Sequence, residues 1–134
     1  MAIQLSIAVR NARLDAIETI VGATAKLGIR TGAQPANCAA ADTGSLLATL
    51  VLPADWMSDA AAGAKALLGA WAVAAIDAGT AGHFRLYAND GTTCGMQGTI
   101  TATGNGGDLT LDDITIEIAQ TVTVTGFTLT DGNA

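Results

Sequence analysis

The stretch Gln120-Thr-Val-Thr-Val-Thr-Gly-Phe-Thr-Leu-Thr130 decides the fold, because it alternates threonine with apolar residues almost without a break. Successive side chains on a β-strand point to opposite faces, so this run has one apolar face and one threonine face. Its β-branched residues also favour a pleated strand. We therefore predict a long strand over residues 120–130, central to a β-sandwich.

The apolar phase of this strand slips by one residue near Gly126. Val122 and Val124 are even-numbered, whereas Phe127 and Leu129 are odd-numbered. A one-residue slip would turn half of the apolar set to the wrong face of the sheet. A β-bulge restores the phase, and glycine suits a bulge, so we predict a bulge at Gly126.

Outward from this strand, the chain shows short apolar-alternating runs separated by turn signals. That pattern is typical of a mainly β fold, and we expect an antiparallel, jelly-roll-like β-sandwich with one N-terminal α-helix. Asn89-Asp90-Gly91 is the strongest hairpin signal, because these residues supply the positive φ of a tight turn. The other expected strands cover residues 26–31, 45–52, 64–71, 82–88, 93–103, 108–111 and 114–118. The last four residues, 131–134, are expected to fray.

Residues 5–22 are expected to form the helix, because apolar residues recur there at spacings of three and four. One apolar line consists of Ile7, Leu14, Ile17 and Val21. A second, adjoining line consists of Val9, Ala12, Ala16 and Ile20. The wide apolar stripe either caps the open end of the helix's own sandwich or docks on a neighbouring subunit. We accordingly divide the chain into an arm, residues 1–24, that packs on the domain or on a neighbour, and a β-sandwich domain, residues 25–134.

Five large apolar residues are candidate contacts with a partner or with another copy of the chain. They are Ile7, Leu14, Ile17, Val21 and Trp56. Trp56 stands in a polar turn, residues 54–62, and is either a lid on the core or an exposed anchor.

Composition excludes several classes of partner. The 134 residues suit one domain, and only 13% are charged, which is about half the usual share. With a net charge of −6, the chain offers no basic footprint for nucleic acid or anionic lipid. The most apolar window, residues 66–76, is shorter than the ~20 residues of a membrane span, and no targeting segment is expected. So little charge indicates that part of the surface is covered in an assembly, and we expect a homo-oligomer.

No motif predicts catalysis. The chain has no G-x-S-x-G, H-E-x-x-H, C-x-x-C or phosphate-loop pattern. The single histidine, His83, lies on the polar face of an expected strand and is interpreted as a surface residue. We expect no catalytic residue, no cofactor and no metal, and therefore no enzyme.

Two further groups of residues, three aspartates and two cysteines, each have a structural and a functional interpretation. Asp108, Asp112 and Asp113 indicate a solvated turn rather than a calcium loop, because their spacing does not match the known calcium-binding pattern. Cys38 and Cys94 are too few for a disulfide framework. Free buried thiols are the default reading, with a single disulfide as the alternative.

Several segments together resemble a known family. They are Ala12-Arg-Leu-Asp-Ala-Ile-Glu-Thr-Ile-Val-Gly22, Thr80-Ala-Gly-His-Phe-Arg-Leu-Tyr87, Cys94-Gly-Met-Gln-Gly-Thr99, Gly107-Asp-Leu-Thr-Leu-Asp112 and the closing run from Gln120 to Asp131. This pattern resembles small virion structural proteins of tailed bacteriophages and prophages. The resemblance implies a building block of the particle, assembled in the bacterial cytoplasm and bound to other virion proteins.

Within that resemblance, a capsid decoration protein is the first expectation, and a collar, tail or baseplate component is the alternative. The alternative includes a glycan- or receptor-binding module, which would expose Trp56, Trp71 or Tyr87 in a groove. The family has no catalytic or binding residues that could be assigned to this chain.

Overall fold

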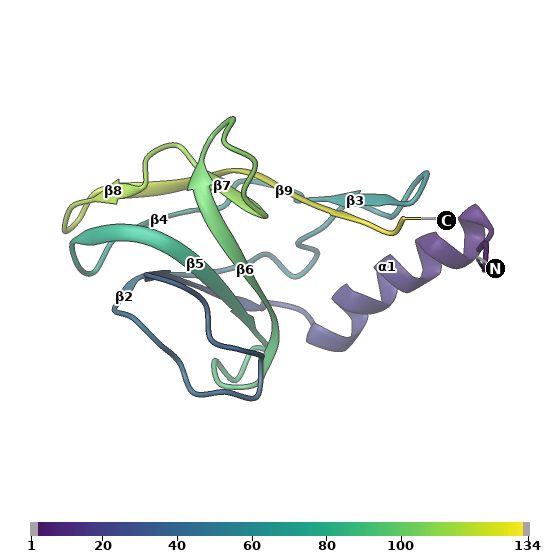
Figure 1. Ribbon diagram of the computed structural model, residues 1–134, viewed down its shortest axis with the longest axis horizontal. Coiled ribbons are helices and arrows are strands. Elements are labelled where there is room, and N and C mark those ends of the chain that lie inside the picture. The colour runs from purple at the N-terminus through teal and green to yellow at the C-terminus, as the bar shows by residue number, and fades with distance from the viewer. Residues whose placement is uncertain (1–2, 133–134) are drawn as a thin grey trace.

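The computed structural model describes residues 3–132 as one helix and nine strands (Figure 1). In chain order they are α1 (Ile7–Val21), β1 (Lys26–Thr31), β2 (Leu46–Val51), β3 (Ala64–Ala66), β4 (Ala72–Ala74), β5 (Gly79–Tyr87), β6 (Cys94–Ala102), β7 (Leu109–Leu111), β8 (Thr115–Ile116) and β9 (Thr121–Thr130). The prediction of a mainly β fold with one N-terminal helix is confirmed.

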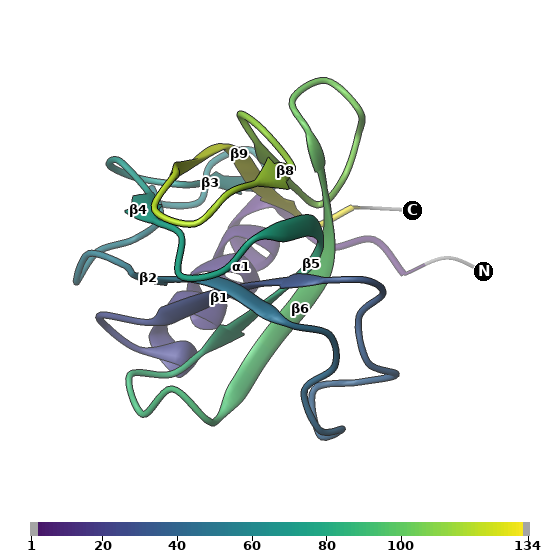
Figure 2. The same cartoon turned by 90° about the vertical axis from the view of Figure 1, so that its left-hand side faces the viewer.

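The strands form one curled sheet in the order β2-β1-β5-β6-β7-β9-β3, with β4 paired to β9 and β8 paired to β5. Figures 1 and 2 show the sheet curling into a half-barrel, with α1 projecting beside one end. Two stacked sheets, as in a sandwich or jelly roll, are not confirmed.

The sheet is mixed, because β6 and β7 run parallel. The expectation of a purely antiparallel sheet is therefore wrong. The short connection over residues 103–108 turns back on itself through Gly104 and Gly106, which both have positive φ. Gly107 N–H then donates to Thr101 Oγ1 at 2.9 Å, so the returning chain enters β7 in the direction of β6.

Strand β9 confirms the predicted bulge. Thr110 of β7 lies opposite Gly126, but the next residue, Leu111, lies opposite Val124, so Thr125 is the extra residue. Val122 and Val124 before the bulge, and Phe127 after it, are all buried. β9 pairs with β7 on one side and with β3 and β4 on the other, so it has partners along most of its length.

The expected strand over residues 64–71 is wrong in extent. It ends at Ala66, and β4 begins only at Ala72, because Gly69 has a φ of 81° that a strand cannot accommodate. The two short strands pair with different parts of β9.

A chain of aromatic rings fills the inside of the curl. Trp56 lies 6.3 Å from Trp71, Trp71 lies 5.6 Å from Phe127, and Phe127 lies 5.6 Å from Phe84, measured between ring centroids. All four side chains are buried, and the aliphatic residues of β1, β2, β5 and β9 surround them.

The loop of residues 32–45 covers the outer face of β5 and β6. His83 Nδ1 donates to the Gly32 carbonyl at 2.9 Å, and Gln97 Nε2 donates to the Pro35 carbonyl at 2.6 Å. His83 is fully buried, so its interpretation as a surface residue is wrong. Alternation along β5 placed it on the correct face, but that face is covered by a loop from a distant part of the chain.

Candidate docking surface on the N-terminal helix

Helix α1 has clear local start and stop signals. The Ser6 Oγ accepts a hydrogen bond from Val9 N–H at 3.3 Å, which caps the first turn. Gly22 has a φ of 92°, and its N–H donates to the Glu18 carbonyl at 2.9 Å. The helix spans residues 7–21, close to the predicted 5–22.

The polar side of α1 faces the rest of the protein. Asn11, Asp15 and Glu18 share one face, because they are spaced by four and three residues. Their side-chain oxygens accept backbone N–H bonds of 2.9–3.0 Å from the segment before β3. The donors are Gly63 to Asn11, Ala60 to Asp15, and both Trp56 and Met57 to Glu18. The helix therefore satisfies the backbone of residues 56–63, which lies largely outside the sheet.

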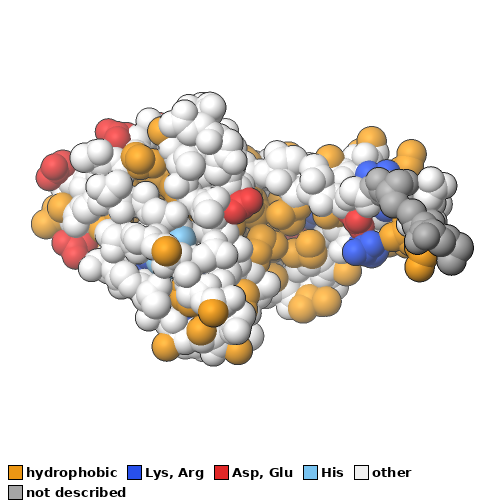
Figure 3. Space-filling model, in the orientation of Figure 1, with side chains coloured by type: hydrophobic (Ala, Val, Ile, Leu, Met, Phe, Trp, Pro, Cys, Tyr) orange, Lys and Arg blue, Asp and Glu red, His pale blue; other side chains and the backbone are white. Residues whose placement is uncertain are grey.

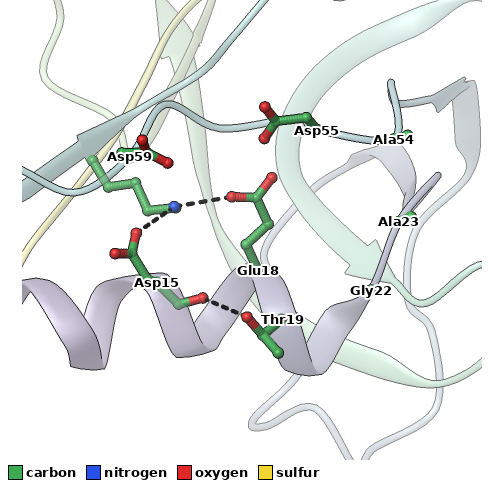
Figure 4. A pocket seen from close by; sticks show the side chains of 9 residues that line it. Asp15, Glu18, Thr19, Gly22, Ala23, Ala54, Asp55 and Asp59 are labelled. Atoms are coloured by element: carbon green, nitrogen blue, oxygen red, sulfur yellow. Dashed lines mark hydrogen bonds and ion pairs between the residues drawn. The ribbon is translucent and has the colours of Figure 1, made fainter.

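A buried lysine completes this contact. Lys65 of β3 is 3% exposed, and its Nζ lies 2.7 Å from Asp15 Oδ1 and 2.9 Å from Glu18 Oε2. Figure 4 shows Asp15 and Glu18 pointing away from α1, toward the segment that carries Asp55 and Asp59. An open polar hollow of about 460 Å³ lies beside the cluster. Lys65 pairs with both helix carboxylates, so the cluster acts as an internal clamp on α1.

The cluster shifts its own protonation equilibria toward the charged forms. The hydrogen bond from Lys65, followed by that from Ala60 N–H, lowers the pKa of Asp15. Burial would raise the pKa of Glu18, but the bonds from Lys65, Met57 and Trp56 outweigh it and lower that pKa. Burial would likewise lower the pKa of Lys65, and its bonds to Asp15 and Glu18 outweigh it and raise that pKa.

These shifts predict loss of the clamp at both ends of the pH range. The Asp15 and Glu18 contribution is present above their unfolded pKa values of about 4, and it is lost as pH falls through their lower folded values. The Lys65 contribution is present below an unfolded pKa of about 10.4, and it is lost as pH rises through the higher folded value. Urea midpoints measured against pH should therefore fall below about pH 4 and above about pH 10.5.

Two sets of variants distinguish loss of this clamp from acid unfolding that is caused by other carboxylates. Asp15→Asn with Glu18→Gln should lower the urea midpoint at neutral pH and reduce the fall of that midpoint at acid pH. Asp77→Asn, which removes an exposed carboxylate from the connection between β4 and β5, should leave the wild-type profile. If the urea midpoint of the double variant falls at acid pH as that of the wild type does, Asp15 and Glu18 are not the cause of the fall.

The opposite side of α1 is apolar and open. Ile20 is 83% exposed and Val9 46%. Ile3, which precedes the helix, is 78% exposed. Figure 3 shows apolar side chains gathered over α1 and along the hollow between α1 and the body of the protein. Single exposed apolar residues are ordinary, but a helix that turns Asn11, Asp15 and Glu18 inward and leaves Val9 and Ile20 outward is unusual.

An apolar groove of about 250 Å³ continues this surface onto the sheet. It is lined by Arg13, Ala16, Ile17, Ile20, Val21 and Gly95. Gly95 forms the floor on β6, where a Cβ would lie 2.7 Å from Val21 Cγ2, so a side chain there would need Val21 to move. Together, Val9, Ala16, Ile17 and Ile20 with this groove make up what we call the α1 outer surface.

The five predicted contact residues have different positions. Ile17 belongs to the α1 outer surface. Ile7 is 57% exposed in the first turn, but it lies on the side of α1 that carries Asn11 and Leu14, four and seven residues further on. Leu14 and Val21 are 4% and 7% exposed and pack inward. Trp56 is fully buried, and its Nε1 donates to the Gly22 carbonyl at 3.0 Å. It is a lid on the core, and the exposed-anchor alternative is wrong for it.

Three residues of the second apolar line, Val9, Ala16 and Ile20, lie on the α1 outer surface, although none of them was among the five predicted contact residues. The 3.6-residue period of this line indicated that its residues share one face of the helix. The period could not show that Asn11, Asp15 and Glu18 would face the protein and leave this line outward.

The remaining singled-out residues serve the fold. Asp112 Oδ1 accepts from Asp113 N–H and Thr123 N–H, and Asp108 Oδ2 accepts from Thr99 N–H, so these carboxylates stabilise turns. Trp71 and Tyr87 are 2% and 7% exposed. With Trp56 also buried, these three aromatic side chains do not form the sugar-stacking groove of the alternative expectation.

Asp131 lies against α1. Its carbonyl accepts from Arg10 Nε at 2.6 Å, and its carboxylate pairs with Arg13 at 3.2 Å. The expected fraying is therefore wrong for Asp131, while residues 133–134 lie outside the described part of the chain.

Comparison of the chain with protein-family models, curated proteins and solved structures gave no match. Across residues 3–132, α1 is too short and too polar to cross a membrane.

Proposed function

We propose that this protein is a non-enzymatic structural subunit of a tailed-bacteriophage particle, a capsid decoration protein that binds the shell in many copies. The observation that carries the proposal is the orientation of α1. Its hydrogen-bonding side chains contact the protein's own body, and Val9, Ile17 and Ile20 are left for another surface.

The energetics favour an apolar protein partner. Burying an isoleucine or valine side chain contributes about 1.5–3 kcal/mol, so Val9 and Ile20 together offer a few kcal/mol of association energy. Charge contributes little, because Arg13, the one charged residue lining the groove, is already paired with Asp131. Such a surface fits a repeated, weakly charged neighbour such as a capsid subunit, and binding would stabilise the assembled shell by mass action.

The resemblance to virion structural proteins supports the same reading, and the low charge of the chain suits close packing of many copies. A collar, tail or baseplate position is the alternative for the same surface. Quantitative mass spectrometry of purified particles separates the two. We expect a copy number near that of the major capsid protein, and a small copy number would support the alternative.

Ile20→Asp tests the α1 outer surface directly. The side chain is 83% exposed, so the variant should fold normally but bind at least about tenfold more weakly, because a carboxylate would be buried at the contact. The assay is occupancy of the protein on particles or shells depleted of it, measured against concentration.

Ile118→Asp is the matched control, since Ile118 is 65% exposed and lies by β8, at the end of the sheet away from α1 (Figure 1). It should bind as the wild type does. Equal occupancy by the two variants would contradict the docking role of α1, and absence of the protein from purified particles would contradict the virion assignment.

A further inference from the structure

The covering loop, residues 32–45, brings Cys38 to the face of the sheet that carries Cys94. Cys94 is the strand partner of Tyr87 across the β5–β6 ladder, so it stands on the same face as Tyr87 and Arg85. Arg85 Nη2 donates to the Cys38 carbonyl at 2.7 Å, which places Cys38 over that face. The two cysteines, 56 positions apart in the sequence, are therefore neighbours in the fold.

A buried arginine holds this arrangement in place. Arg85 is 2% exposed, and its Nη1 donates to the Ala40 carbonyl at 2.9 Å and to Asp42 Oδ1 at 2.7 Å. The Tyr87 hydroxyl donates to the same Asp42 oxygen at 2.6 Å. Both cysteines are free and half-buried, and a hollow of about 270 Å³ reaches Cys38, so a small reagent has access.

We propose that Cys38 and Cys94 form a modification site, a dithiol that closes to an intrachain disulfide by exchange with a small-molecule disulfide. One cysteine thiolate attacks a sulfur of the reagent, which releases one small thiol and leaves a mixed disulfide. The second cysteine thiolate attacks the protein sulfur of that mixed disulfide and releases the second small thiol. Two electrons pass from the two cysteines to the reagent, and the two cysteine protons end on the released thiols.

The surroundings set the rate of this exchange. Burial, and then the neighbouring Cys94 thiol, raise the pKa of Cys38, while the nearby Arg85 guanidinium opposes them in part. Because the thiolate is the reactive form, exchange should be slow at neutral pH and accelerate as the pH rises. The site therefore stays reduced in a reducing cytoplasm and oxidises after prolonged exposure to an oxidising medium.

The disulfide would attach the covering loop covalently to β6, at the end of the strand nearest the groove. The inference is independent of the docking proposal, because it rests on the loop and β5 rather than on the α1 outer surface. It requires only that the two thiols react with one another before they react with other chains.

The test uses the purified full chain, incubated with oxidised glutathione over a range of pH. We expect both free thiols to be lost together, the mass to fall by two hydrogen atoms, and a Cys38–Cys94 peptide to appear after non-reducing digestion. The oxidised protein should melt higher than the reduced protein by roughly 10 °C, because closing the long loop restricts the unfolded chain. Cys38→Ser and Cys94→Ser each retain one thiol and should give only a mixed disulfide with glutathione.

A second measurement detects whether the two thiols are adjacent, without requiring that they form a disulfide. Dibromobimane, which becomes fluorescent when it bridges two adjacent thiols, should label the wild type and neither single variant. The proposal is overturned if the wild type ends with two glutathione adducts, forms only dimers through intermolecular disulfides, or keeps both thiols free after exchange at high pH.

Discussion

Trp56→Ala should lower the free energy of unfolding by about 3–5 kcal/mol, the usual loss when a large aromatic core side chain is truncated. Trp56 is fully buried and stands at the end of the aromatic chain, 6.3 Å from Trp71. Its ring fills the space between α1 and the sheet, so the substitution leaves a cavity at that junction. It also removes the Nε1 donor of the Gly22 carbonyl, close to the C-terminal end of the helix.

Trp56→Phe separates these two contributions. Phenylalanine keeps most of the ring contacts but has no N–H, so we expect a loss of only about 1–2 kcal/mol from the hydrogen bond and the smaller ring. Chemical denaturation followed by far-UV circular dichroism measures both variants without relying on tryptophan fluorescence. A loss below about 1 kcal/mol in Trp56→Ala would contradict the burial of this side chain.

Local pattern was sufficient for the features that depend on neighbouring residues. The bulge in β9 could be predicted because period-two alternation and the slip at Gly126 are both contained within eleven residues. The helix bounds were predictable for the same reason, since Gly22 ends the helix and the apolar spacing marks its length. Turn chemistry at Asn89-Asp90-Gly91 likewise depends only on the residues of the turn.

Features that depend on distant segments were missed. Alternation along β5 placed His83 correctly on the polar face of the strand, yet it could not show that residues 32–45 would cover that face. The parallel pairing of β6 with β7 has the same origin, because it depends on how residues 103–108 pack against Thr101. Neither the covering loop nor the parallel pairing leaves a periodic pattern in the sequence from which it could be predicted.

The orientation of α1 is the most consequential case. Amphipathic reasoning turns an apolar stripe inward, because apolar burial is normally what holds a helix on its domain. Here Leu14 and Val21 are buried, but the stronger directional contacts come from Asn11, Asp15 and Glu18. Their partners lie about 40–50 residues further along the chain, so nothing near the helix in the sequence indicates them.

Deletion of the N-terminal arm is consequently a poor test of docking. It would leave Lys65 buried without its carboxylates and would expose Trp56, so the rest of the chain should be destabilised as well. Point substitutions on the α1 outer surface avoid this problem, because they leave the clamp intact.

Lys65→Met should lower the free energy of unfolding by about 2–3 kcal/mol. Removing one partner of a buried ion pair costs about 3–5 kcal/mol, and we expect less because the Asp15 side chain is 46% exposed and can be hydrated. The methionine fits the volume of the lysine stem, so the loss reports the missing charge rather than a cavity. Lys26→Met is the matched control, since Lys26 of β1 forms no ion pair among residues 3–132, and it should change stability by less than about 0.5 kcal/mol.

The combination of Lys65→Met with Glu18→Gln shows whether the pair acts as a unit. If it does, the double variant should be more stable than the sum of the single losses predicts, by about 0.5–3 kcal/mol, because the largely buried Glu18 charge is gone and the remaining Asp15 carboxylate is 46% exposed. Hydrogen exchange gives the local readout, since the N–H groups of Trp56, Met57 and Ala60 donate to the helix carboxylates and should lose protection first in Lys65→Met. Full protection of these amides in Lys65→Met would show that their bonds to Asp15 and Glu18 persist without Lys65, and the α1 outer surface would then keep its orientation without the ion pairs.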